Sequence, residues 1–221
     1  MEKINKINWQ RFKELVSKLI RYKTQTTSVP VRAESWEEVI YAVLLYMEYK
    51  VVWEPTSHAK GIDIKVEING DELRISAKGG KIVTNDRNLL TISSYRLTRY
   101  GGIESMLEFL RENSEEIDIY LICAREEKGA NVKYRVFKII AHELVPDEML
   151  DSSNWEEDNQ AWVLTEGTKK GLEARIVKKM SNQLWYTISL NYPPLETLVE
   201  ATISKKEIGV ALVEVLKLLD K

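Results

Sequence analysis

Cysteine is nearly absent from this sequence. Cys123 is the only one among 221 residues, so no disulfide can form within the chain. A chain without disulfides suits a reducing compartment, and we expect a prokaryotic, cytoplasmic location. Cys123 lies in the apolar run 117–124, where a free thiol is typical of a buried core residue.

Long apolar runs are missing as well. No run of eighteen apolar residues occurs, which argues against a membrane-spanning helix, and the N-terminal residues lack the apolar segment of a signal peptide. Two histidines and one cysteine do not make a Cys/His metal set, and there is no phosphate-cradling glycine-rich loop and no nucleophile elbow. We therefore expect no membrane partner, and a small-molecule enzyme has no motif to support it.

Charge is balanced overall but unevenly distributed. The chain is 44% apolar and 30% charged with a net charge of −2, which is ordinary for a globular protein and does not by itself suggest nucleic acid. Between residues 74 and 103, however, a single acid, Asp86, stands among six basic residues: Arg74, Lys78, Lys81, Arg87, Arg96 and Arg99. A local basic stretch can bind a polyanion while acids elsewhere balance the total charge.

Hydrophobic spacing predicts strands interleaved with helices. Helical spacing covers residues 8–22, 35–49, 103–111 and 204–219, and strand patterns cover 51–54, 62–68, 73–78, 117–124, 132–140, 161–165, 175–178 and the end of 180–189. Ser35 and Glu38 form a capping-box pattern at the start of the second helix. We predict an α/β (α+β) fold with a mixed central β-sheet flanked by helices. It would form one domain, 1–221, with a candidate loop insertion around 149–160.

The most informative stretch is 61–78, which reads as a β-hairpin. Apolar and polar residues alternate on both sides of Asn69-Gly70, the strongest short hairpin signal. A two-residue turn predicts that Ile64 pairs with Ile75 and Val66 with Leu73, so that apolar side chains share one face. The same register puts Asp63 opposite Ser76, with Lys78 one step further along the same face. An acid, a hydroxyl and an amine would then share one polar patch, although such a patch is also common on a solvated strand.

A second region, 84–102, is dense in side chains that form hydrogen bonds. Arginine and asparagine can contact guanine and adenine edges, and arginine, serine and threonine hold phosphates, although a polar helix face with loops has the same composition. Asn182 and Gln183 could read bases in the same way. Met47 fits a core position, or a wedge between base pairs. The predicted DNA-contacting residues are Lys81, Asn85, Arg87, Asn88, Ser94, Arg96, Arg99, Asn182, Gln183 and Met47.

Asp63, followed by Ser76-Ala-Lys78 on the next strand and preceded by Glu38 on a helix, resembles the PD-(D/E)xK nuclease family. The resemblance covers residues 38–78, and it implies a restriction-endonuclease-like fold, magnesium and phosphodiester hydrolysis. The chain departs from the family pattern at Ile62, where proline is usual, and at Ser76, where a second acid is usual. Some type II restriction enzymes that resemble this chain have Ser-x-Lys and recruit a carboxylate from elsewhere. The candidates here are Glu38 or, failing that, Glu67, Asp86 or Glu104.

The resemblance implies a homodimeric type II restriction enzyme of a restriction-modification system, which cuts double-stranded DNA at specific sequences with Mg²⁺. In that interpretation Asp63 and Glu38 hold the metal, Lys78 activates the attacking water, and Ser76 completes the catalytic group. A palindromic target would call for a two-fold symmetric dimer. Two alternatives stay open: a repair or junction-resolving nuclease of the same fold, and a non-catalytic DNA-binding protein with a decayed nuclease site.

Overall fold

The computed structural model describes residues 2–27, 29–31, 33–53, 61–83, 88–165 and 171–212, without the side chains of residues 33 and 34. Within these ranges the helices are α1 (Trp9–Thr26), α2 (Ala33–Tyr46), α3 (Ile103–Ser114) and α4 (Ala141–Leu144). Short 3₁₀ turns are η1 (Glu2–Lys6), η2 (Asp147–Leu150), η3 (Ser152–Asn154), η4 (Lys178–Met180) and η5 (Lys205–Glu207). No helix in these ranges is long and apolar enough to cross a membrane.

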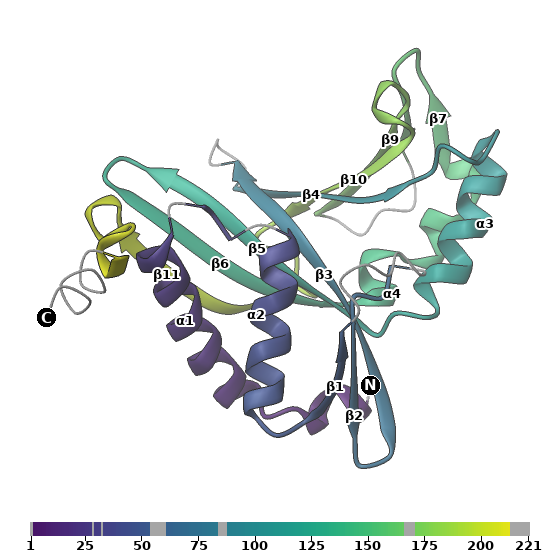
Figure 1. Cartoon of the computed structure of the whole chain (residues 1–221). Helices are drawn as coiled ribbons and strands as arrows, with labels where there is room; N and C mark the ends of the chain where they lie inside the picture. Colours follow the sequence, from purple (N-terminus) through teal and green to yellow (C-terminus); the bar gives the residue numbers. More distant parts are fainter. Residues whose placement is uncertain are drawn as a thin grey trace, which may run out of the picture.

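The strands form one large mixed sheet, as predicted (Figure 1). They are β1 (Lys50–Trp53), β2 (Ile64–Ile68), β3 (Asp71–Val83), β4 (Leu89–Arg96), β5 (Ile119–Lys128), β6 (Asn131–Ile140), β7 (Trp155–Glu157), β8 (Ala161–Leu164), β9 (Leu172–Val177), β10 (Gln183–Ser189) and β11 (Glu196–Ser204). The order is β11-β6-β5-β3-β4-β10-β9-β8-β7, with β1 and β2 branching from β3. β3 and β5 are parallel, and α3 lies between them in the chain.

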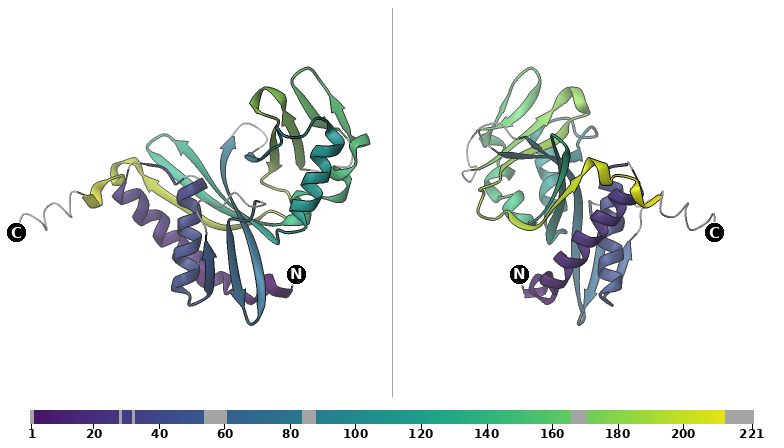
Figure 2. Two further views of the ribbon diagram at one scale, coloured as in Figure 1. Left: turned by 45° about the vertical axis from the view of Figure 1, so that its right-hand side comes forward. Right: turned by 90° about the vertical axis from the view of Figure 1, so that its left-hand side faces the viewer.

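Two hydrophobic cores lie on the two faces of the sheet. The first, the helix-pair core, packs α1 and α2 onto β2, β3, β5, β6 and β11. Trp36 of α2 is fully buried there, and its Nε1 donates to the Leu121 carbonyl at 2.8 Å. The second, the α3 core, joins α3 to β4, β8, β9 and β10 and to the other face of β5 and β6. Figure 2 shows the α1–α2 pair and α3 at opposite ends of the curved sheet.

The hairpin register agrees with the prediction residue by residue. Ile64 pairs with Ile75, Val66 with Leu73 and Ile68 with Asp71. The alternation of apolar residues in β2 matches its burial, because Ile64, Val66 and Ile68 are buried and the two residues between them are exposed. Asn69 and Gly70 both have positive φ, 51° and 85°, as this tight turn requires.

Three local predictions were wrong. α2 begins at Ala33, so Ser35 lies inside the first turn and is not its N-cap. The segment expected as a loop insertion folds into η3 and β7, and Met149 and Trp155 are buried in the α3 core. The predicted C-terminal helix is interrupted, because residues 205–207 form η5 and Gly209 has a φ of +74°. The rest of that predicted helix, from residue 213, lies outside the described residues.

Candidate functional site

The candidate site lies where the sheet divides. Along one edge of β3, pairing with β2 ends at Ile75, and pairing with β4 begins at Gly80. Residues 76–79 have no partner strand on that edge among the described residues, while β5 pairs with their other edge throughout. We call the gap, with Asp63 and residues 76–79, the fork. A break of this kind leaves backbone groups that side chains or a ligand must satisfy in place of a partner strand.

The Asp63 carboxylate contacts residues 76–78 of β3 in the fork. Its Oδ2 accepts a hydrogen bond from the Ala77 backbone N–H at 2.6 Å, in the place where a partner strand would offer a carbonyl. The same oxygen accepts from Ser76 Oγ at 3.1 Å and from Lys78 Nζ at 3.3 Å. Ionised carboxylates favour such donors, and three donors on one oxygen fix its orientation. The predicted acid, hydroxyl and amine are therefore in direct contact.

Exposure differs across this group. Ser76 is fully buried, whereas the side chains of Asp63 and Lys78 are 20% and 17% exposed. Asp63 Oδ1 has no hydrogen-bond partner among the described residues. One carboxylate oxygen is thus anchored to β3, and no described residue bonds to the other, which lies beside a lysine amine. This arrangement can bind a hard cation and place a cation next to a phosphate.

Tyr95 is a neighbour of the fork that the sequence did not single out as a site residue. Burial raises the pKa of Tyr95 to about 12, with the Tyr120 hydroxyl lowering it and the negative charge of Asp63 raising it. A Cβ placed on Gly61 would lie 2.7 Å from the Tyr95 hydroxyl oxygen, so this hydroxyl packs directly against the backbone that leads to Asp63. No sequence signal marks this contact, because it depends on how β4 folds back over residues 61–63.

None of the described acids among the candidates to replace the one missing at Ser76 makes a hydrogen bond or ion pair to Asp63. Glu38 is exposed and forms an ion pair with Lys23 of α1, and Glu67 pairs with Lys50 at 2.5 Å. Glu104 lines a separate cavity between α3 and η2, and Asp86 lies outside the described residues. Among the residues that are described, no cluster of three or more His, Cys, Asp or Glu side chains could hold a metal ion.

Glu37 is the α2 carboxylate that lies toward the hairpin. Its Oε2 accepts from Trp53 Nε1 at 3.2 Å, and Trp53 pairs with Ile64, the residue after Asp63. The capping-box interpretation drew attention to Glu38 instead. No local sequence signal separates these adjacent glutamates, and in the structure Glu38 lies on the exposed side that meets α1.

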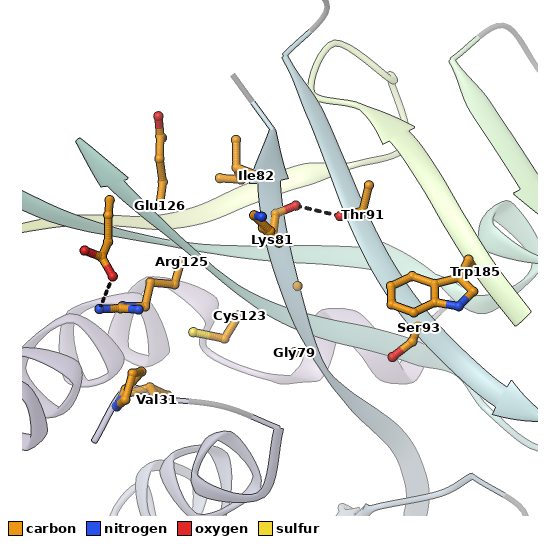
Figure 3. Close-up of a pocket in the computed structure, with 13 residues that line it drawn as sticks. Val31, Gly79, Lys81, Ile82, Thr91, Ser93, Cys123, Arg125, Glu126 and Trp185 are labelled. Carbon is orange, nitrogen blue, oxygen red and sulfur yellow. Dashed lines mark hydrogen bonds and ion pairs between the residues drawn. The ribbon is translucent and has the colours of Figure 1, made fainter. Parts of the chain in front are cut away.

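Lys81, a predicted DNA contact, lines a cavity of about 610 Å³ (Figure 3). Gly79, Thr91, Ser93, Arg125 and Trp185 line it as well, and their side chains come from β3, β4, β5 and β10. Side chains alternate along a strand, so Lys81 and Lys78 project to opposite faces of β3. The cavity therefore lies on the face away from Ser76 and Lys78. Cys123 also borders it, and burial raises the pKa of this predicted core thiol to about 12.

The prediction that Gln183 reads bases was wrong. Gln183 is 7% exposed, and its Nε2 donates to the Ser94 and Tyr95 carbonyls at 2.8 and 3.1 Å. Its Oε1 accepts from Arg96 Nε at 3.2 Å. The pairing of β10 with β4 shifts register at this point, so Gln183 takes up the backbone carbonyls that a bulge leaves free. Its polar groups are used inside the protein.

The other predicted DNA contacts are scattered. Asn88 and Asn182 both hold left-handed turns, with φ of 48° and 49°, and the Ser94 hydroxyl is buried. Arg96 and Arg99 are exposed. Met47 is half-buried against the helix-pair core, which fits the core interpretation and not the wedge. Asn85 and Arg87 lie outside the described residues.

Comparison of the chain with protein-family models, with curated proteins and with solved structures finds no significant match. Any function proposed for this chain therefore rests on the geometry of the fork.

Proposed function

We propose that the chain is a magnesium-dependent endonuclease that hydrolyses phosphodiester bonds in double-stranded DNA, as a type II restriction enzyme does. The single observation that carries the proposal is the contact of Asp63 with Ser76, Ala77 and Lys78 at an open fork between strands. The mixed sheet with helices on both faces is consistent with a restriction-endonuclease-like fold.

Each group of the fork has a definite role in this proposal. Asp63 holds the cation through Oδ1, because Oδ2 is already anchored to β3. Lys78 lies on the same side as the carboxylate, where its amine can orient the attacking water and stabilise negative charge on the phosphate. Ser76 is buried and donates to Asp63, so its role is to position the carboxylate and not to react.

The donor set fits a magnesium ion that relies on the protein for few ligands. Mg²⁺ usually takes one or two carboxylates and completes its octahedron with substrate phosphate and water. Asp63 supplies one carboxylate, and substrate phosphate and water would provide the remaining ligands. A bound ion would lower the pKa of the attacking water and neutralise charge on the phosphate.

The proposed nucleic-acid contacts are the exposed basic side chains of β3 and β4 and the loop that follows β4. Lys81, Arg96 and Arg99 are the described members of this set. Contacts of this kind hold phosphates and fix the register of the duplex without reading the sequence. A palindromic target would bring two copies of the chain together about a two-fold axis, so we also propose a homodimer on DNA.

Digestion of a sequenced plasmid tests the proposal. With Mg²⁺ the protein is expected to give discrete bands, and EDTA is expected to abolish them. Asp63→Asn should remove cutting and keep DNA binding. An Asp63→Asn protein that cuts as well as the wild type would show that this carboxylate is not the metal ligand, and a wild-type protein that neither cuts nor binds DNA would end the proposal.

A second candidate is a DNA-binding protein that no longer cuts. Ser76 at the usual position of an acid, together with the lack of an acid cluster among the described residues, favours it. The same digestion separates the two candidates, because this protein would bind duplex DNA and leave it intact with Mg²⁺ and with Mn²⁺.

A further inference from the structure

Three tyrosine hydroxyls are buried together behind the fork. Tyr95 comes from β4, Tyr120 from β5 and Tyr186 from β10, and the side chains of Tyr120 and Tyr186 are fully buried. The Tyr95 and Tyr120 hydroxyls interact with each other, and none of the three hydroxyl oxygens makes a hydrogen bond to a described residue outside the group. They are close enough to influence one another, since burial raises the pKa of Tyr120 well above its ordinary value and Tyr95 and Tyr186 add to that rise.

Buried hydroxyls without partners are rare in folded proteins, because each loses its hydrogen bonds to water. Phenylalanine would fill the same space without this loss. A group of three buried hydroxyls with no hydrogen bond outside the group therefore calls for a role that packing does not provide.

The cluster touches the fork through Tyr95. A Cβ on Gly61 would meet the Tyr95 hydroxyl oxygen at 2.7 Å, so the hydroxyl lies against the backbone two residues before Asp63. The Asp63 charge also contributes to the raised pKa of Tyr95 and of Tyr120, but not to that of Tyr186. Tyr120 pairs along the sheet with Ser76, which itself donates to Asp63. Asp63 thus contacts β3 directly, and Tyr95 packs against Gly61, two residues before Asp63.

The ring of Tyr95 is held in place by α3. Tyr95 meets Phe109 edge to face, with ring centroids 5.5 Å apart and planes at 89°. Phe109 also packs against Tyr100 at 4.9 Å. A ring fixed from behind carries its hydroxyl at a defined position, which is what a group that orients a ligand-binding side chain needs.

We propose that Tyr95 is a positioning residue that holds residues 61–63 so that the free Oδ1 of Asp63 points at a divalent cation in the fork. The proposal rests on the proposed function, in which Asp63 binds that cation. Tyr95 acts through Asp63 and does not itself touch the cation or the DNA. Tyr120 supports Tyr95 from β5, and Tyr186 is further from the carboxylate.

Binding of Mn²⁺ by the full chain without DNA, followed by electron paramagnetic resonance, tests the proposal. Three variants are compared with the wild type: Asp63→Asn, Tyr95→Phe and, as the matched control, Tyr186→Phe. Loss of a group that hydrogen-bonds a metal ligand typically costs about 10–100-fold in metal affinity, and Tyr95 acts by packing against Gly61, so Tyr95→Phe is expected to weaken Mn²⁺ binding by about three- to ten-fold. Tyr186→Phe removes the same atom from the same cluster and is expected to change the affinity less than about two-fold.

Thermal unfolding of the same proteins shows whether a lower affinity comes from lost structure. If Tyr95→Phe lowers the melting temperature and leaves Mn²⁺ binding intact, its role is structural and the inference is overturned. Equal losses of affinity in Tyr95→Phe and Tyr186→Phe would also overturn it. If Asp63→Asn binds Mn²⁺ as tightly as the wild type does, Asp63 is not the metal ligand and the proposed function fails. If Asp63→Asn weakens Mn²⁺ binding but Tyr95→Phe does not, only the inference about Tyr95 fails.

Discussion

The hairpin 61–78 and the β4–β10 pair carry the same kinds of polar side chain, yet they use them differently. In the hairpin, Asp63 and Lys78 meet at the fork and stay partly exposed. In the β4–β10 pair, Gln183 is buried and gives its hydrogen bonds to the Ser94 and Tyr95 carbonyls. Both side chains take up backbone groups that the sheet leaves unpaired, but Asp63 stays partly exposed while Gln183 is buried.

The largest expected effect concerns the fork. Asp63→Asn and Lys78→Met are each expected to lower the rate of DNA cutting by about 10²–10³-fold or more, as loss of a group that stabilises transition-state charge does. Glu67→Gln is the matched control, since Glu67 lies on β2 of the same hairpin and pairs with Lys50. A Glu67→Gln protein as slow as the other two would mean that the hairpin, and not the fork, responds to substitution.

Gln183→Leu tests whether the β4–β10 pair serves stability, in contrast to the fork. Loss of the hydrogen bonds to Ser94, Tyr95 and Arg96 leaves buried carbonyls unpaired, and we expect the free energy of unfolding to fall by about 1–3 kcal/mol. Urea denaturation measures this fall, with Thr187→Val on the same strand as the control. A protein with an unchanged urea midpoint and a changed cleavage pattern would restore the base-reading interpretation of Gln183.

A smaller effect is expected at the turn and tests how strongly the turn residues fix the register of the hairpin. Gly70→Ala places a side chain at φ +85°, and we expect a loss of about 1 kcal/mol of folding stability. No atom lies within 4 Å of a Cβ at either Gly70 or Gly101, and φ is positive only at Gly70, so Gly101→Ala is the matched control. Equal thermal stability of the two variants would show that the turn does not constrain the register.

The smallest effect is expected at Arg96. Arg96→Ala should weaken binding to duplex DNA modestly and reduce the slope of log affinity against log salt by about one. Arg21→Ala serves as the control, because Arg21 lies on α1 and pairs with Glu207. Since Arg96 Nε also bonds to Gln183, the unfolding free energy of both variants is measured in parallel. Unchanged affinity at moderate salt removes Arg96 from the proposed interface.

The sequence predicted what depends on neighbours along the chain. Alternation and the Asn69-Gly70 turn set the register that brings Asp63, Ser76 and Lys78 together, and the mixed sheet followed from interleaved helices and strands. It did not predict contacts that depend on distant pairing. The burial of Gln183 follows from the bulge between β10 and β4, and the place of Tyr95 follows from the fold of β4 over Gly61.

Glu37 and Glu38, two adjacent acids of α2, show the same limit. A capping box at Ser35 and Glu38 is a local pattern that predicted where α2 begins. The helix begins earlier, at Ala33, so this pattern does not mark its N-terminus. Which of two adjacent glutamates lies toward the hairpin depends on the angle at which α2 packs on the sheet, and the hydrogen bond from Trp36 to the Leu121 carbonyl is one of the contacts that hold α2 there. Sequence spacing alone cannot supply such an angle.

A double-mutant cycle at the fork tests the central claim, that Asp63 and Lys78 act together on one phosphodiester. The rate of cutting of a plasmid is measured for the wild type, Asp63→Asn, Lys78→Met and the double variant under saturating Mg²⁺. Groups that act as a unit are strongly non-additive, so the double variant should be about as slow as either single one. Losses that multiply, or a single variant that cuts at the wild-type rate, would contradict the account.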